Sequence, residues 1–119
     1  MVNKRDFKKY VDALGASVIE EMMFAYYNIE GADRKGISSA VGKALAAVEN
    51  AKNNANRFFD RGAKSFADHK EYAAAKRNFF RQLFQKIEKD FNDQINESIK
   101  EFNAALPESV KQAQKAAVN

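Results

Sequence analysis

Apolar residues recur at spacings of three and four along almost all of the 119-residue chain, and this pattern limits the fold more than any other feature. Such spacing places apolar side chains on one face of an α-helix. Residues that interrupt helices are rare, with five Gly and one Pro. We therefore expect an all-α protein. Short connections at 31–36 and 62–64 predict an antiparallel, up-and-down bundle.

The pattern predicts three long helices and a short C-terminal helix within a single domain, residues 1–119. The predicted bounds are about 3–28, 38–60, 65–104 and 107–117. Asp33 is an alternative N-cap for the second helix, and Ser65 begins a weak capping box for the third. Pro107 suits the first turn of the last helix.

The composition predicts an unusual core, because the chain has 20 Ala and 10 Phe but only 4 Leu. Large rings must therefore pack against methyl groups. Ala47, Ala51 and Ala55 follow one another at i, i+4, so we expect the second helix to approach a neighbouring helix closely. Gly15 interrupts the apolar pattern of the first helix, which indicates either a close helix crossing or a tolerated defect.

The third helix is too long for its partners: it would reach ~60 Å, against roughly 35 to 40 Å for the other two. Either it bends near Asn92 and Asp93, or its second half projects beyond the bundle. A projecting second half would need cover for its apolar residues, Phe91, Ile95, Ile99 and Phe102. The leading hypothesis is therefore a non-enzymatic helical interaction or scaffold module that forms a homodimer through these residues, or binds another protein there.

The charge distribution agrees with self-association. The net charge is +4, yet residues 62–89 carry seven basic and three acidic groups, whereas residues 90–119 carry three basic and five acidic groups. An antiparallel pairing of two third helices would place the basic half of one beside the acidic half of the other. The alternative, that these charges are solvated faces with an accidental bias, stays open.

A second hypothesis is binding to the phosphate backbone of nucleic acid. Lys70, Arg77 and Arg81 are spaced to share one side of the third helix, and Arg57 and Arg61 close the second helix. Together these five residues would form a basic end of the bundle. Arg57 and Arg61 also suit the C-terminus of a helix for reasons of the helix dipole.

A third hypothesis places a small apolar ligand between helices. The first helix is apolar on almost all sides over residues 22–27, which is typical of core packing but also of a pocket wall.

Catalytic chemistry has little support in the sequence. The chain has no Cys and one His, His69, so neither thiolate sites nor the two Glu-x-x-His pairs of a di-iron bundle are possible. The segment with Gly36, Gly42 and Lys43 departs from the phosphate-loop pattern in its spacing and in lacking a Ser or Thr after the lysine. We expect no enzyme, no metal and no cofactor.

The sequence also indicates a location. The longest apolar run covers six residues, 22–27, against ~20 needed for a membrane span. The basic N-terminus is not followed by the apolar stretch of a signal peptide. We therefore expect no membrane span and a cytoplasmic protein.

Overall fold

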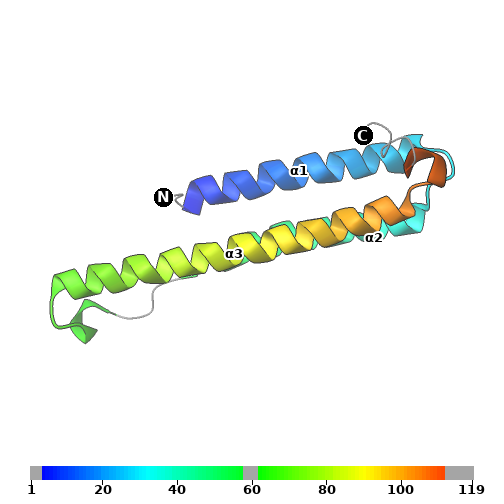
Figure 1. Ribbon diagram of the computed structural model, residues 1–119. Coiled ribbons are helices and arrows are strands. Elements are labelled where there is room, and N and C mark those ends of the chain that lie inside the picture. Colours follow the sequence, from blue (N-terminus) through cyan, green and yellow to red (C-terminus); the bar gives the residue numbers. More distant parts are fainter. Residues whose placement is uncertain (1–3, 58–61, 112–119) are drawn as a thin grey trace.

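The computed structural model of the chain describes residues 4–57 and 62–111, and all of its long elements are helices. The helices are α1 (Lys4–Asn28), α2 (Arg34–Asn54) and α3 (His69–Ala105), with a short 3-10 turn, η1 (Ala63–Ser65), before α3 (Figure 1). Residues 108–111 are helical as well. The predicted all-α fold with three long helices and a short C-terminal helix is confirmed.

Contacts between the helices show that successive long helices run in opposite directions. Lys8 Nζ lies 2.6 Å from Asn56 Oδ1, and Asp12 Oδ1 lies 3.1 Å from Lys52 Nζ, so α1 and α2 are antiparallel. At the other side of α2, the Asp33 amide donates to the Ala105 carbonyl over 2.8 Å, and Lys43 pairs with Glu101. α3 therefore runs antiparallel to α2 and parallel to α1.

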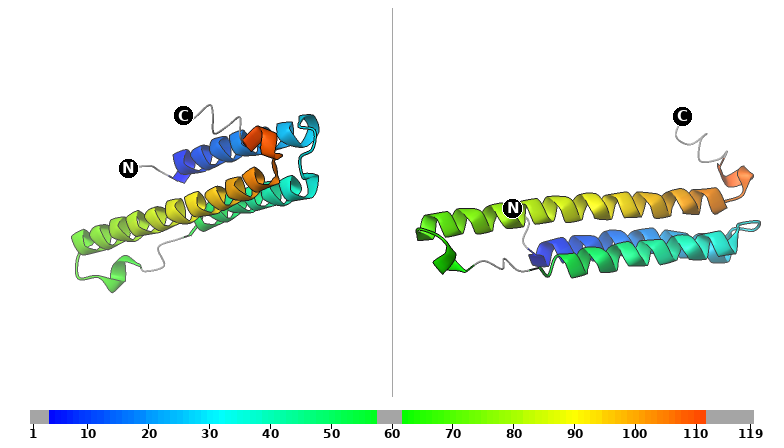
Figure 2. Two further views of the ribbon diagram at one scale, coloured as in Figure 1. Left: turned by 45° about the vertical axis from the view of Figure 1, so that its right-hand side comes forward. Right: turned by 90° about the horizontal axis from the view of Figure 1, so that it is seen from below.

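The three helices form an L in cross-section, with α2 at the corner. In Figure 1 α2 lies behind α3 and α1 stands apart, whereas in the right view of Figure 2 α1 and α2 overlap and α3 stands apart. The backbones of α1 and α3 accordingly approach each other much less than either approaches α2. One position of a four-helix square, between α1 and α3, holds no long helix from residues 4–57 or 62–111.

The close packing of α2 follows from its small side chains. Its buried residues are Ile37, Ala40, Ala44, Ala47 and Ala51. Methyl groups at the contact let the neighbouring helices approach, and the rings of α1 and α3 fill the space beyond them. This confirms the predicted role of the alanine ribbon. Gly15 is buried where α1 crosses α2, opposite Val48, so the predicted close crossing is also present.

Two helix starts differ from the sequence prediction because aspartates, not serines, cap them. α2 begins four residues early, with the Asp33 carboxylate accepting from the Gly36 amide at 3.2 Å. α3 begins four residues late, with Asp68 accepting from the Glu71 amide at 2.8 Å. Ionised caps complement the positive N-terminal end of a helix.

The predicted helix ends agree less well at α2 than at α3. α2 ends at Asn54, before the predicted 60, whereas α3 ends at Ala105, one residue after the predicted 104. The predicted stretches 58–60 and 112–117 lie outside the described residues.

α3 is one continuous helix, and its first half projects instead of its second. No break occurs at Asn92 or Asp93 within His69–Ala105. α2 has ended by the level of Ile87, which shares a core cluster with Ala55. Residues 69–83, here called the projecting half, extend past the ends of α1 and α2 (Figure 1). The prediction that the second half projects is therefore wrong.

Candidate interaction surfaces

The four residues predicted to form a dimer interface lie inside the chain's own bundle. Phe91, Ile95 and Phe102 are 1%, 4% and 7% exposed, and Ile99 is half-buried against the same clusters. These side chains pack on α1 and α2, so they do not form the exposed apolar ridge that the sequence predicted. The cause is the late start of α3, which moves its second half alongside the other helices.

The apolar pattern that continues into the projecting half has less cover. Phe80, Leu83 and Phe84 are half-buried, whereas Ile87, one turn after Leu83, is 3% exposed. Phe80 contacts the neighbouring ring of Phe79 at 5.2 Å between centroids. The same face of one helix therefore changes from core to partly exposed surface at the level where α1 begins and α2 ends.

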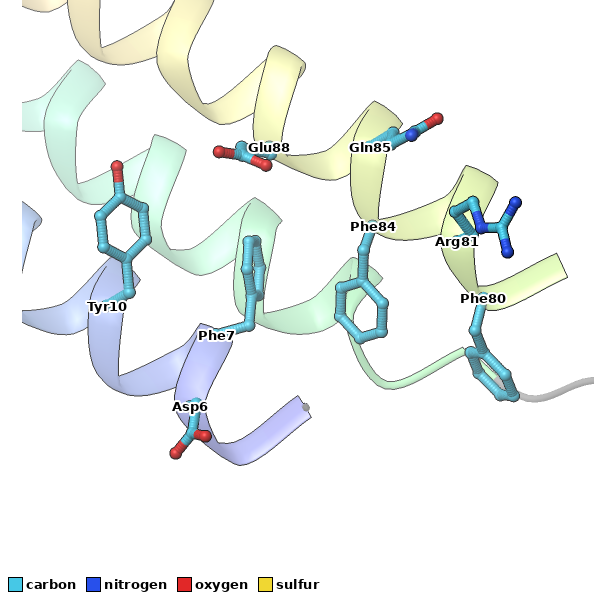
Figure 3. A pocket seen from close by; sticks show the side chains of 8 residues that line it. All are labelled: Asp6, Phe7, Tyr10, Phe80, Arg81, Phe84, Gln85 and Glu88. Carbon is cyan, nitrogen blue, oxygen red and sulfur yellow. The ribbon is translucent and has the colours of Figure 1, made fainter. Parts of the chain in front are cut away.

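A cavity of about 560 Å³ lies at this transition, between the start of α1 and the end of the projecting half. The rings of Tyr10, Phe7, Phe84 and Phe80 follow one another along it from α1 to α3 (Figure 3). Phe7 and Phe84 pack edge to face, with centroids 5.4 Å apart. Polar groups border these rings, namely Asp6, Arg81, Gln85 and Glu88.

The sequence pattern does not predict this cavity. Each ring belongs to the apolar face of its own helix, and the contact joins residues that are far apart in the sequence. The hypothesis of an apolar pocket concerned residues 22–27 instead, where Met22 is 1% exposed and packed in the core. Phe24 and Tyr27 are 65% and 69% exposed, so they face outward.

The predicted basic residues are distributed over two elements. Lys70, Arg77 and Arg81 are all exposed on α3, and the unbroken helix keeps them on one side, as predicted. Arg57 is exposed just after α2. Arg61 lies outside the described residues, so the predicted five-residue basic end is present in the described structure only as this strip and Arg57.

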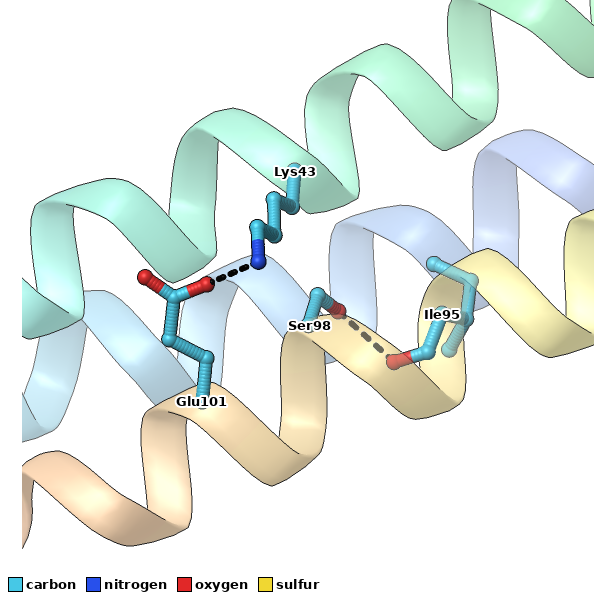
Figure 4. Close-up of polar contacts among 4 residues, drawn as sticks. All are labelled: Lys43, Ile95, Ser98 and Glu101. Atoms are coloured by element: carbon cyan, nitrogen blue, oxygen red, sulfur yellow. Dashed lines mark hydrogen bonds and ion pairs between the residues drawn. The ribbon is translucent and has the colours of Figure 1, made fainter.

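An ion pair joins α2 to α3 on the outer side of the bundle. Lys43 Nζ lies 2.6 Å from Glu101 Oε2, an oxygen that solvent hardly reaches (Figure 4). The hydrogen bond that Lys43 donates to Glu101 lowers the pKa of Glu101 and raises the pKa of Lys43. Nearby, the buried Ser98 hydroxyl donates to the Ile95 carbonyl at 2.7 Å, so this polar group is satisfied within its own helix.

The Lys43–Glu101 pair predicts a pH dependence of stability. The pKa of Glu101 is lowered on folding, so the ionised carboxylate stabilises the folded state. This stabilisation is complete above the ordinary carboxyl pKa and is lost as the pH falls through the lower pKa of the folded state. We expect Glu101→Gln to lower the melting temperature at pH 7 but to change it little at pH 2. The matched control is Glu49→Gln, an exposed carboxylate on α2. An equal loss for Glu101→Gln at both pH values would contradict the assignment.

The described residues contain no cluster of three or more His, Asp or Glu side chains placed to hold a metal ion. His69 is the exposed first residue of α3. None of the helices in residues 4–57 and 62–111 has the length and apolar character to cross a membrane. Comparison with protein-family models, curated proteins and solved structures finds no match to this chain.

Proposed function

We propose that this protein is a non-enzymatic helical interaction module that self-associates through the projecting half of α3. The observation that supports the proposal is the length of α3. It extends past both partner helices while keeping the apolar face that, one turn later, is buried in the core. We also propose a cytoplasmic location, since a chain without Cys suits a reducing compartment.

Burial of the apolar side chains of the projecting half in a dimer is energetically favourable. Complete burial of a Phe or Leu side chain contributes about 1.5–3 kcal/mol relative to exposure, and Phe80 and Leu83 are both incompletely buried in the single chain. A two-fold dimer gains each contribution twice, because both copies contribute the same surface. The proposal thus keeps α3 as the contact helix and moves the contact from its second half to its first.

Light scattering after size exclusion tests the proposal over a series of protein concentrations. We expect the wild type to have the mass of a dimer, and Phe80→Asp to raise the dissociation constant by about a hundredfold or more, because two apolar side chains are lost per dimer. The control is Phe24→Asp, which alters a 65% exposed ring near the C-terminal end of α1, the end opposite to the projecting half, and should leave the mass unchanged. Circular dichroism checks that both variants stay helical. A monomeric wild type would refute the proposal.

The exposed strip of Lys70, Arg77 and Arg81 favours nucleic-acid binding as a second candidate function. Contacts to phosphates release counterions, so binding would fall steeply with salt, whereas an apolar dimer would not dissociate. The same chromatography separates the two when absorbance is recorded at 260 and 280 nm. Co-purified nucleic acid that Arg77→Ala reduces and salt removes would support the second candidate.

A further inference from the structure

The side of the bundle between α1 and α3 is only partly covered. Tyr10 is 46% exposed, although its ring packs edge to face on that of Phe91 with the ring centroids 6.4 Å apart. Leu14, Val18 and Ile99 are half-buried around the same side. We call this surface the open side and define it by residues of α1 and α3, namely Tyr10, Leu14, Val18, Phe84, Glu88, Asn92 and Ile99.

The two ends of the open side differ. At one end lies the cavity lined by Phe7, Phe80 and Phe84 (Figure 3). At the other end the chain turns at Pro107, and Val110 packs on the cluster that includes Ile99. Lys111 Nζ also donates to the Ala104 carbonyl at 3.3 Å. The open side therefore extends along α3 from about Phe84 to about Ile99 before residues 107–111 close it.

This length nearly equals that of the projecting half. Residues 84–99 number 16 and the projecting half has 15, so each covers about 23 Å along the helix axis. A helix segment of this length fits the open side without reaching residues 107–111. A fourth helix in that position would complete the square that the L-shaped arrangement leaves incomplete.

The charges of the two surfaces are complementary. Residues 69–83 carry four basic groups and one acidic group, whereas residues 84–99 carry two basic and four acidic groups. A parallel pairing of two α3 helices would place the two basic segments, residues 69–83 of each copy, side by side, and their like charges would repel. An antiparallel pairing instead brings each basic half beside the acidic half of the other copy.

We propose that the projecting half of a second copy lies antiparallel in the open side, and that its own open side receives the projecting half of the first. This inference rests on the proposed self-association and adds its geometry. In the register set by the length match, Phe84 lies near its own counterpart and residue 69 lies near residue 99 of the other copy. Arg81 then lies near Glu88 of the second copy, and each cavity is closed by the other chain.

Engineered cysteines test this register directly, because the chain has no native Cys. In the proposed register, residue 77 of one copy lies within one residue of the level of residue 92 of the other. The double variant Arg77→Cys/Asn92→Cys should therefore form a disulfide-linked dimer under mild oxidation, with most of the protein in the dimer band on a non-reducing gel. Within one chain these two positions are about 22 Å apart along α3, too far for an internal disulfide.

The single variants are matched controls with distinct outcomes. In the proposed register two copies of residue 77 are about 21 Å apart along the helices, so Arg77→Cys alone should not cross-link, and neither should Asn92→Cys alone. Efficient cross-linking of Arg77→Cys alone would mean that the two projecting halves pair only with each other, which overturns the register but leaves self-association intact. A dimeric double variant that does not cross-link also overturns it. A monomer by light scattering would instead refute the proposed function itself.

Discussion

Replacing Phe91 by Ala is expected to destabilise the protein by about 3–5 kcal/mol, a large part of the stability of a single small domain. Phe91 is 1% exposed, and its cluster contains residues from all three long helices. Ala lacks the whole ring, and the side chains around Phe91 belong to long helices that are held in place by their other contacts. These helices cannot move in to fill the space, so the free energy of forming a cavity adds to that of the lost buried apolar area.

Chemical denaturation measures this loss, with Phe24→Ala as the matched control. Both residues are phenylalanines within long helices, but Phe24 is 65% exposed, so its replacement should change stability by no more than about 0.5 kcal/mol. The result also separates two roles for Phe91. A change of less than about 1 kcal/mol, together with dissociation of a dimer, would mean that Phe91 belongs to an interface between copies and not to the core.

The helices themselves follow from local sequence patterns. The three-and-four spacing of apolar residues predicted the end of α1 at Asn28, where Gly31 follows the last helical turn and adopts the left-handed backbone with φ of 84°. The sequence allows two starts for α2, because Asp33 and Ser38 are both good caps. Asp33 caps it and extends the helix by a turn, over a Gly36 that packs close to Ala105.

Which part of α3 meets the bundle could not be predicted from the pattern. The apolar face continues without interruption from Phe80 through Ile87 to Phe102, so either half is equally able to form the core. The choice depends on where the chain after α2 turns back. Asp68, which caps α3 well beyond the end of α2, determines this position. Local spacing carries no information on such a displacement.

The candidate site was predictable only where it lies on one helix. Lys70, Arg77 and Arg81 share a strip because their spacing fixes their common side once the helix is continuous. The cavity, by contrast, depends on contact between Phe7 and Phe84. That contact requires the relative positions of α1 and α3, which result from the packing of both on α2.

Gly15→Ala should destabilise the protein by about 1–3 kcal/mol, even though Ala favours helix over Gly. A Cβ at this position would overlap Cγ2 of Val48. Val48 is β-branched and keeps one preferred side-chain rotamer within a helix, so it cannot turn away without strain. The helices must separate instead, which loosens the alanine contacts along α2.

Two control variants, Gly42→Ala and the double variant Gly15→Ala/Val48→Ala, test whether the effect comes from the close crossing of α1 and α2. Gly42 lies on the exposed side of the same bundle, and a Cβ there has no neighbour within 4 Å. Its replacement should therefore stabilise α2 by about 0.5–1 kcal/mol. In a Val48→Ala background the overlap is gone, so Gly15→Ala should become neutral or stabilising when measured by denaturation. If Gly15→Ala destabilises equally with and without Val48, the glycine is needed for a reason other than the close approach of α1 and α2.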